Sequence, residues 1–386
     1  MHKNRWEAWL PVISGQDGSV KAAGQRLVLY LLAGVYRLGL AIKNRRWNNP
    51  AQIKRVAVPV ISVGNLTTGG TGKTPMVQWL CRYLRDRDLR VALLSRGYGS
   101  VNAGPNDEAL ELELSLPDVP HLQDADRVRI AEVAIEELET QCLVLDDGFQ
   151  HRRLHRDLDM VLIDATCPFG FGHMLPRGLL REPKSALSRA DVLVITRCDQ
   201  VSDPELKRIE EELQKYCQSP RTLIAKTVHQ PVALVDSRGV RRPLTDLSDY
   251  RLLLFAGIGN PNAFFQKVRQ MGAQVAGTRS FPDHYHYQRE DIQSLRAWVD
   301  EHRVNETEPN LRPWLIVTTR KDLVKLDISQ LSGVDVVAME VELQFQSGEV
   351  QFKELVESAA ALADRTTNTS TGSYTGGSTG SSTGRE

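Results

Sequence analysis

The chain has 386 residues, of which 41% are hydrophobic and 25% charged, a composition that excludes a largely disordered or collagen-like protein. This length predicts two domains, or at most three. Lysine plus arginine and aspartate plus glutamate both total 48. A net charge of zero argues against a nucleic-acid-binding protein, which is usually basic overall, so we expect no nucleic-acid partner.

The charge is unevenly distributed along the chain. No acidic residue occurs between Ser19 and Arg85, a stretch that contains eleven lysine and arginine residues. The segment 101–140 is strongly acidic instead. The N-terminal stretch is therefore expected to attract anions, either phosphates or an acidic membrane surface.

An apolar segment, LVLYLLAGVYRLGLAI at 27–42, lies inside this basic stretch and is followed by several basic residues and Trp47. A membrane-spanning helix needs about 20 apolar residues, and this run is shorter. An apolar body with a basic flank favours a helix that lies in the membrane interface, and a helix buried against the protein is the alternative. We interpret residues 1–55 as a basic, amphipathic, membrane-associating region.

The segment 56–225 alternates short β-branched runs with helical patterns. Helices are predicted at 73–87 and 124–140, and strands at 56–63, 91–95, 142–147, 159–164 and 192–197. Such alternation is typical of an α/β domain whose parallel sheet is covered by helices on both faces. With the glycine-rich loop described below, it predicts a P-loop NTPase-like kinase domain.

A second, smaller α/β domain is predicted over 251–362, with strands at 252–258, 314–319 and 334–340 and helices at 262–271 and 288–302. Residues 226–250 alternate polar and apolar side chains around Ser237-Arg238-Gly239, which predicts a β-hairpin linker between the two domains. Residues 363–386 consist mainly of Ser, Thr and Gly, and we expect a disordered tail.

The strongest motif is GNLTTGGTGKT at 64–74, between a predicted strand and a predicted helix. This context indicates a phosphate-binding loop, in which Lys73 reaches the β- and γ-phosphate oxygens and the Thr74 hydroxyl binds Mg²⁺. The pattern G-x-x-x-x-G-K-[ST] is not strictly met because Thr67 replaces the first glycine, and a structural glycine turn is the alternative. The predicted nucleotide-binding residues are Thr67, Thr68, Gly69, Gly70, Thr71, Gly72, Lys73 and Thr74.

An acidic pair, Asp146-Asp147, ends the apolar run LVL at 143–145. In a parallel sheet this places a carboxylate beside the phosphate loop, where it can hold Mg²⁺ directly or through water. A strand end at the protein surface is the alternative.

Two strand ends favour a rival interpretation. The tetrapeptides at 196–199 (TRCD) and 319–322 (TRKD) resemble the [NT]KxD element with which P-loop GTPases recognise guanine, although Arg replaces the lysine in both. The alternatives to a kinase are therefore a P-loop GTPase or metallochaperone-like switch, and a nucleotide-regulated membrane adaptor without turnover.

Taken together, the motifs resemble those of the tetraacyldisaccharide 4'-kinase family, from the N-terminal helix to about residue 345. In order along the chain they are GNLTTGGTGKTP, SRGYG, NDE, DDGFQH, FGFGHMLPRGLLREP, AGIGNPNAFF, FPDH and TRKDLVK. The resemblance implies ATP-dependent phosphorylation of the 4'-hydroxyl of an acylated glucosamine disaccharide 1-phosphate in lipid A biosynthesis. It also implies peripheral or monotopic attachment at the cytoplasmic face of the inner membrane of a Gram-negative type of cell.

The same resemblance assigns residue roles. It implies that Asp107 and His284 form a catalytic pair across the two domains and that Lys73 completes the catalytic set. The implied Mg²⁺ ligands are Thr74, Asp146, Asp147 and Glu108, and the implied substrate contacts are Arg96, Tyr98, Arg127, His151, Arg181 and Glu182. The chain has Asp283-His284-Tyr285-His286 where Asp-His-His is common, so His286 is a second candidate for the catalytic histidine.

Overall fold

The computed structural model describes residues 9–97, 107–217, 222–282, 285–304 and 312–362. One 13-stranded sheet runs through this part of the chain in the order β10-β9-β11-β13-β7-β6-β5-β1-β4-β2-β3, with β12 beside β13 and β8 beside β7. Neighbouring strands are parallel except in the pairs β7–β13, β7–β8 and β12–β13. The predicted α/β class with a mostly parallel sheet is confirmed.

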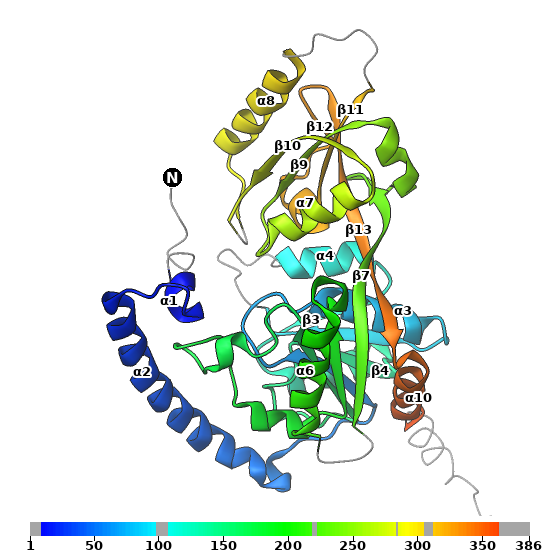
Figure 1. The fold of residues 1–386 in the computed structure, drawn as a ribbon. Coiled ribbons are helices and arrows are strands. Elements are labelled where there is room, and N and C mark those ends of the chain that lie inside the picture. The colour runs from blue at the N-terminus through cyan, green and yellow to red at the C-terminus, as the bar shows by residue number, and fades with distance from the viewer. Residues whose placement is uncertain (1–8, 98–106, 218–221, 283–284, 305–311, 363–386) are drawn as a thin grey trace, which may run out of the picture.

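Two lobes lie at opposite ends of the sheet (Figure 1). The N-lobe, residues 56–217 together with helix α10, contains β1 (Val60–Asn65), β2 (Val91–Ser95), β3 (His121–Gln123), β4 (Cys142–Asp146), β5 (Leu158–Asp164) and β6 (Val192–Thr196). The C-lobe, residues 244–331, contains β9 (Arg251–Ala256), β10 (Gln274–Ser280), β11 (Trp314–Thr319) and β12 (Gln330–Leu331). Two long strands, β7 (Leu223–Val235) and β13 (Val334–Ser347), join the lobes.

Helices cover both faces of the sheet in each lobe. Those of the N-lobe are α3 (Lys73–Arg85), α4 (Asp107–Ser115), α5 (Arg127–Leu138), α6 (Asp203–Gln214) and α10 (Glu349–Ala360), and those of the C-lobe are α7 (Pro261–Gln270), α8 (Arg289–Val304) and α9 (Arg320–Leu326). Short 3₁₀ turns occur at Arg46–Asn48, Pro50–Gln52, Gly170–Gly172, Lys184–Arg189, Cys198–Gln200 and Leu244–Asp249. Strand β1 is buried on both faces, because Ile61 and Val63 pack toward α3 while Val60 joins the core beneath α5.

The connection between the lobes differs from the predicted linker. A short hairpin does form within 226–250, because Val235 of β7 pairs with Arg241 of β8 (Arg241–Arg242). The lobes, however, are joined by the antiparallel pairing of β7 with β13, which is distant in sequence. Pairing between distant strands leaves no local signature in the sequence, so hydrophobic alternation alone could not reveal it.

The predicted range 251–362 for the second domain is wrong at its C-terminal end. Strand β13 runs back toward the N-lobe, and α10 then packs there through Phe352 and Val356, in the same core as Met76 and Leu80 of α3. These apolar side chains lie one turn apart on α10 and are fully buried. The last helix therefore belongs to the N-lobe.

The N-terminal region forms α1 (Leu10–Ser14) and the long helix α2 (Val20–Arg45), which lies along one side of the N-lobe (Figure 1). Ser19 caps α2 by accepting a hydrogen bond from the Ala22 amide. Only Ala22 and Ala33 of α2 are buried, so the alternative of a helix buried against the protein is wrong. Among the described residues, one helical stretch, Val20–Asn48, is long and apolar enough to cross a membrane. This stretch is longer than the apolar segment 27–42 that was identified from the sequence.

Candidate active site

The phosphate loop lies between β1 and α3, as predicted from the sequence. Gly69 and Gly72 have φ angles of +120° and +85°, which L-amino acids with side chains rarely adopt. A Cβ atom at residue 72 would also lie 2.8 Å from Nε2 of His229 on β7. The loop conformation therefore requires glycine at these positions, and the backbone amides at the start of α3 are left available for an anion.

Segments outside the loop hold its backbone in place. The Thr68 amide donates a hydrogen bond to the Leu179 carbonyl at 2.8 Å, and the Arg181 amide donates to the Leu66 carbonyl at 2.9 Å. The Thr196 hydroxyl at the end of β6 donates to the Thr71 carbonyl at 2.9 Å. These bonds preorganise the loop, so less ordering is needed when a ligand binds.

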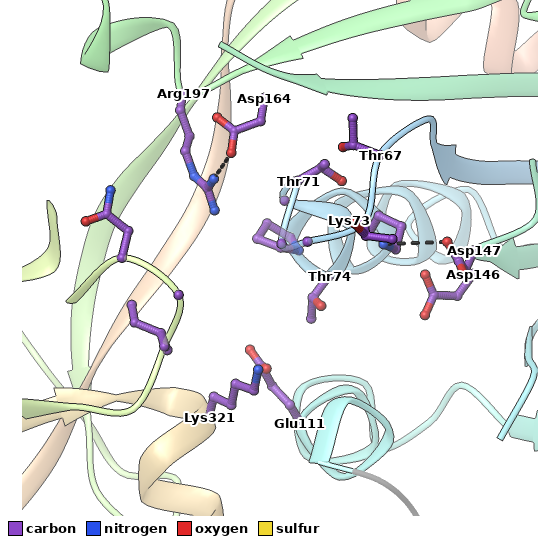
Figure 2. Close-up of a pocket in the computed structure, with 18 of the residues that line it drawn as sticks. Thr67, Thr71, Lys73, Thr74, Glu111, Asp146, Asp147, Asp164, Arg197 and Lys321 are labelled. Atoms are coloured by element: carbon purple, nitrogen blue, oxygen red, sulfur yellow. Dashed lines mark hydrogen bonds and ion pairs between the residues drawn. The ribbon is translucent and has the colours of Figure 1, made fainter. Parts of the chain in front are cut away.

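Asp147 follows β4 and lies between two cations. Its carboxylate is 3.6 Å from Nζ of Lys73 (Figure 2). It is 2.8 Å from Nη1 of Arg181. Burial by itself would raise the pKa of Asp147, but the Lys73 ammonium and the Arg181 guanidinium outweigh it and lower that pKa. Asp147 is therefore ionised and holds both cations at the phosphate loop.

Asp146 ends β4, and its carboxylate faces the cavity on the same side as Thr74 (Figure 2). Carboxylate and hydroxyl oxygens are the hard ligands that Mg²⁺ prefers, and Mg²⁺ is usually bound by one or two protein groups together with nucleotide phosphates. Among the described residues no cluster of three or more His, Cys, Asp or Glu side chains could hold a metal ion. The donors present fit a Mg²⁺ that is shared with bound phosphates.

A cavity of about 1710 Å³ opens between the two lobes in front of the loop. All of the predicted phosphate-loop residues, 67–74, line it. So do the predicted residues Arg96, Arg127, Asp146, Asp147, His151, Arg181 and Glu182. The structure thus brings these candidate site residues together in one cavity, whereas His286, the second candidate for the catalytic histidine, is exposed and does not line it.

The remaining candidates lie outside what can be described. Tyr98 and His284 are not among the described residues. Asp107 and Glu108 form the first turn of α4, but their side chains are not described. Helix α4 itself lies on the cavity, because Ala109, Glu111 and Leu112 line it.

Arg127 and His151 form a buried polar corner of the cavity. Arg127, the first residue of α5, is only 4% exposed. Burial, together with the nearby Arg127 charge, lowers the pKa of His151 to about 4, so His151 is neutral at pH 7. The Nε2 atom of His151 is buried and has no hydrogen-bond partner among the described residues. A buried ring nitrogen of this kind calls for a polar ligand group.

Glu182 differs from the expectation of a direct substrate contact. The residue is 2% exposed, and its two carboxylate oxygens accept hydrogen bonds from Arg189 at 3.0 and 3.1 Å. Bidentate pairing of this kind fixes both partners. Its neighbour Arg181 is anchored from α2, since the Tyr36 hydroxyl donates to the Arg181 carbonyl at 3.0 Å.

Several cavity residues were not singled out as site residues from the sequence. Arg197 pairs with Asp164 at the ends of β6 and β5 (Figure 2). Lys267 of α7 in the C-lobe forms an ion pair with Asp199 of the N-lobe at 3.0 Å. Lys321 and Glu111, from opposite lobes, point toward one another (Figure 2). Of these residues, Arg197, Asp199 and Lys321 fall within the tetrapeptides at 196–199 and 319–322. Those patterns gave no sign of the contacts.

The guanine-recognition alternative is not supported by the second tetrapeptide. Asp322, its last residue, is fully buried in the C-lobe and accepts a hydrogen bond from the Gly257 amide at 3.0 Å. In the first tetrapeptide, Asp199 lines the cavity but is engaged by Lys267. A carboxylate that is buried and bonded inside the protein cannot bind a nucleotide base.

A glycine-rich loop between a parallel strand and a helix, with a lysine and an acidic strand end beside it, defines a P-loop protein that binds nucleotide phosphates. The model of the family "Tetraacyldisaccharide-1-P 4'-kinase" matches residues 25–361. The chain is 38% identical to tetraacyldisaccharide 4'-kinase of Geobacter metallireducens, covering 82% of this chain and 95% of that protein. It is 35% identical to the Anaeromyxobacter sp. protein of the same name, covering 87% and 92%.

Among solved structures, the chain is similar to LpxK from Aquifex aeolicus, determined in complex with ATP. The two share 28% identity and superpose with a TM-score of 0.67 over 87% of this chain and 99% of that one. The chain belongs to the tetraacyldisaccharide-1-P 4'-kinase family. Its activity is that of a tetraacyldisaccharide 4'-kinase in lipid A biosynthesis, and of the alternatives left open by the sequence this selects the kinase.

Proposed function

We propose that the cavity between the lobes holds ATP on the phosphate loop and the 4'-hydroxyl of the lipid acceptor in front of it. The observation that carries this proposal is the position of Lys73. It lies at the start of α3, lines the cavity and is held by Asp147. The complex of the Aquifex aeolicus relative with ATP supports the choice of nucleotide.

Lys73 and Arg181 supply positive charge where the transferred phosphoryl group gains negative charge. Phosphoryl transfer needs alignment and charge stabilisation more than covalent chemistry. Asp147 keeps both cations in place before the nucleotide arrives. The thirteen-residue helix α3 adds its N-terminal amides to the same region.

Mg²⁺ would be held by the Thr74 hydroxyl and the Asp146 carboxylate, with Asp147 and Glu108 as the further proposed ligands. When bound, Mg²⁺ would neutralise charge on the β- and γ-phosphates. Asp147 already carries two cations, so Asp146 is the better direct ligand of the acidic pair.

Asp107 would accept the proton of the acceptor hydroxyl, and His284 would orient Asp107 or share its proton. A sugar hydroxyl is a very weak acid, so a positioned base promotes its attack. Asp107 begins α4, which contacts α9 of the C-lobe. Approach of the lobes would therefore complete the site.

The acceptor would be bound by the cationic and polar corner of the cavity. Arg96, Arg127 and Tyr98 are proposed to contact its phosphate and sugar, and the unpartnered Nε2 of His151 supports a hydrogen bond to a sugar hydroxyl. Glu182 would act through Arg189, which it holds in place.

The lipid chains would be presented by a membrane surface in contact with α2. The large apolar side chains exposed on α2 are Val20, Leu27, Val28, Tyr30, Leu31, Leu32, Val35, Leu38 and Ile42. Lys43 and Arg45 in its last turn suit anionic head groups. We propose peripheral or monotopic attachment at the cytoplasmic face of the inner membrane, where ATP is available.

A double-mutant cycle on kcat, measured with saturating lipid and ATP, tests the catalytic pair. We expect Asp107→Ala and His284→Ala each to lower kcat by roughly 10²–10⁴-fold, the usual contribution of general-base catalysis. The double mutant should be little worse than the poorer single mutant, because the pair handles one proton. Fully multiplicative losses would show two independent roles, and a large loss in His286→Ala but not in His284→Ala would transfer the role to His286.

A further inference from the structure

Two C-lobe motifs have no role in the account so far, AGIGNPNAFF at 256–265 and TRKDLVK at 319–325, and the segment 281–287 contributes only His284 to it. They meet at one buried carboxylate. We propose that Asp322 is a positioning residue that fixes the cavity-lining loop after β9 and the described residues on either side of His284, which are Phe281, Pro282 and 285–287. This inference rests on the proposed role of His284.

Asp322 lies in the first turn of α9 and is 0% exposed. Its Oδ2 atom accepts hydrogen bonds from the Gly257 amide at 3.0 Å and from the Thr319 hydroxyl at 2.6 Å. Its Oδ1 atom accepts a hydrogen bond from the Tyr287 hydroxyl at 2.9 Å. A buried charge is costly unless it is hydrogen-bonded, and three donors from three different segments stabilise this one.

The hydrogen bond from the Gly257 amide to Asp322 fixes the start of the loop that follows β9. A Cβ atom at residue 257 would lie 2.8 Å from Oδ1 of Asp322 and 3.1 Å from the Tyr287 hydroxyl, so the backbone can approach the carboxylate only as glycine. The next residues, Ile258, Gly259 and Asn260, all line the cavity. Asp322 thus fixes the point at which this loop leaves the sheet and enters the cavity wall.

Further hydrogen bonds hold the described residues on either side of His284. On one side of residues 283–284, the Phe281 amide donates to the Ala256 carbonyl at 2.8 Å. On the other side, Lys325 of α9 donates to the Tyr285 carbonyl at 3.1 Å and Tyr287 donates to Asp322. The rings of Phe281 and Tyr287 pack with their centroids 5.0 Å apart. Both flanks of His284 are therefore bonded to β9 and α9.

The chemistry favours a carboxylate over other polar groups at this position. All three partners are donors, and an ionised carboxylate is an acceptor only. An asparagine would direct its NH₂ group at one of these donors and lose at least one bond. The sequence motif TRKD thus encodes an internal support rather than a base-recognition element.

The chain offers a matched pair of variants to test this inference. Tyr285 and Tyr287 lie in the same segment, and both phenols donate to a carboxylate, Tyr285 to Asp291 at 3.0 Å and Tyr287 to Asp322. We expect Tyr287→Phe to lower kcat by roughly tenfold, the effect of one lost hydrogen bond. Tyr285→Phe should stay within about twofold of the parent, as for a surface change. Equal kcat values for the two variants would overturn the proposal.

Two further variants of the full chain, both at Asp322, separate positioning from a merely structural role. Rates are divided by the concentration of folded, ATP-binding sites, so partial unfolding does not count as lost kcat. Asp322→Asn should lower kcat by roughly 10- to 100-fold, the scale of a small misplacement of reacting groups. Asp322→Glu keeps a carboxylate but moves it by the length of one methylene group, so this variant should also have a lower kcat than the parent. Full kcat per folded site in Asp322→Asn would contradict the positioning role.

The His284→Ala variant tests whether Tyr287→Phe lowers kcat through His284. There Tyr287→Phe should cause no further loss of kcat, because the group that it positions is gone. A persistent tenfold loss would contradict action through His284. A fully active His284→Ala protein would instead refute the proposed catalytic pair. The positioning role of Asp322 is tested separately, by comparing Tyr287→Phe with Tyr285→Phe, so the two failures can be told apart.

Discussion

The Nζ atom of Lys73 lies 3.6 Å from the carboxylate of Asp147, which follows β4, the strand directly beside β1 in the sheet. The same carboxylate accepts two hydrogen bonds from Arg181, at 2.9 and 2.8 Å. One acidic residue therefore keeps two cations at the phosphate loop. Their charge is available for a nucleotide without the cost of ordering long side chains at the moment of binding.

Lys73→Ala should abolish most turnover while the fold persists. The ammonium acts on charge that develops on the phosphates, and removing one such group costs about 10²–10³-fold in kcat in comparable sites. The measurement is kcat together with thermal unfolding. Lys184→Ala is the matched control, because Lys184 is also ion-paired, with Glu212, and does not line the cavity. Near-normal kcat in a folded Lys73→Ala protein would contradict the phosphate-loop assignment.

His229 should make the protein less stable as the pH falls. Burial, with a smaller contribution from Arg197, lowers the pKa of His229 from 6.5 to about 4. Between these values the unfolded chain binds a proton that the folded chain does not, so the free energy of unfolding falls on acidification by at most about 1.4 kcal/mol per pH unit for this group.

Urea unfolding at several pH values between 6.5 and 4 checks this prediction. His229→Gln should flatten the pH dependence of the free energy of unfolding, whereas His286→Gln, at an exposed position, should leave it as in the parent. His121 and His151, whose pKa values burial also lowers to about 4, keep part of the slope in both variants. An unchanged slope in His229→Gln would mean that His229 is not held neutral by the fold.

Substituting the exposed face of α2 should weaken membrane binding without disturbing the fold. Leu31 and Leu38 are both 64% exposed, and each leucine buried in the interface contributes about 1.5–3 kcal/mol. The double variant Leu31→Glu/Leu38→Glu should sediment less with anionic vesicles and raise the KM for the lipid acceptor by about tenfold or more. The KM for ATP should not change.

Val350→Glu is the control for this experiment, because Val350 of α10 is 65% exposed on a helix that packs against the N-lobe core. It should bind vesicles like the parent protein. If the α2 double variant still sediments with anionic vesicles and keeps its KM for lipid, α2 is not the membrane-binding element.

Local patterns predicted much of the fold. The alternation of β-branched runs with helical periodicity gave the parallel strands β1, β2, β4, β5 and β6 of the N-lobe but not the short strand β3. The glycine-rich loop was placed correctly between β1 and α3. The pairing of β7 with β13 and the return of α10 to the N-lobe were missed. Both depend on contacts between residues more than 100 positions apart, such as Tyr83 with Glu357, which no local pattern encodes.

The candidate site also contains some features that local sequence patterns predicted and others that they could not. The loop and the acidic pair have a local signature and lie together as expected. Contacts that depend on the meeting of two lobes, such as Lys267 with Asp199, have none. The TRKD motif shows the opposite error, since its pattern suggests base recognition but its aspartate, Asp322, is buried inside the C-lobe. Burial of Asp322 is a property of the whole fold rather than of four residues.

The most direct test of the account follows the γ-phosphate. The full-length protein, in mixed vesicles with Mg²⁺, is incubated with γ-labelled ATP and tetraacyldisaccharide 1-phosphate, and the lipid is separated and its phosphate position determined by NMR. The account predicts label on the 4' oxygen of the lipid with one ADP formed for each phosphate transferred, and loss of both in Lys73→Ala. Release of labelled inorganic phosphate without labelled lipid, or label at another position, would contradict it.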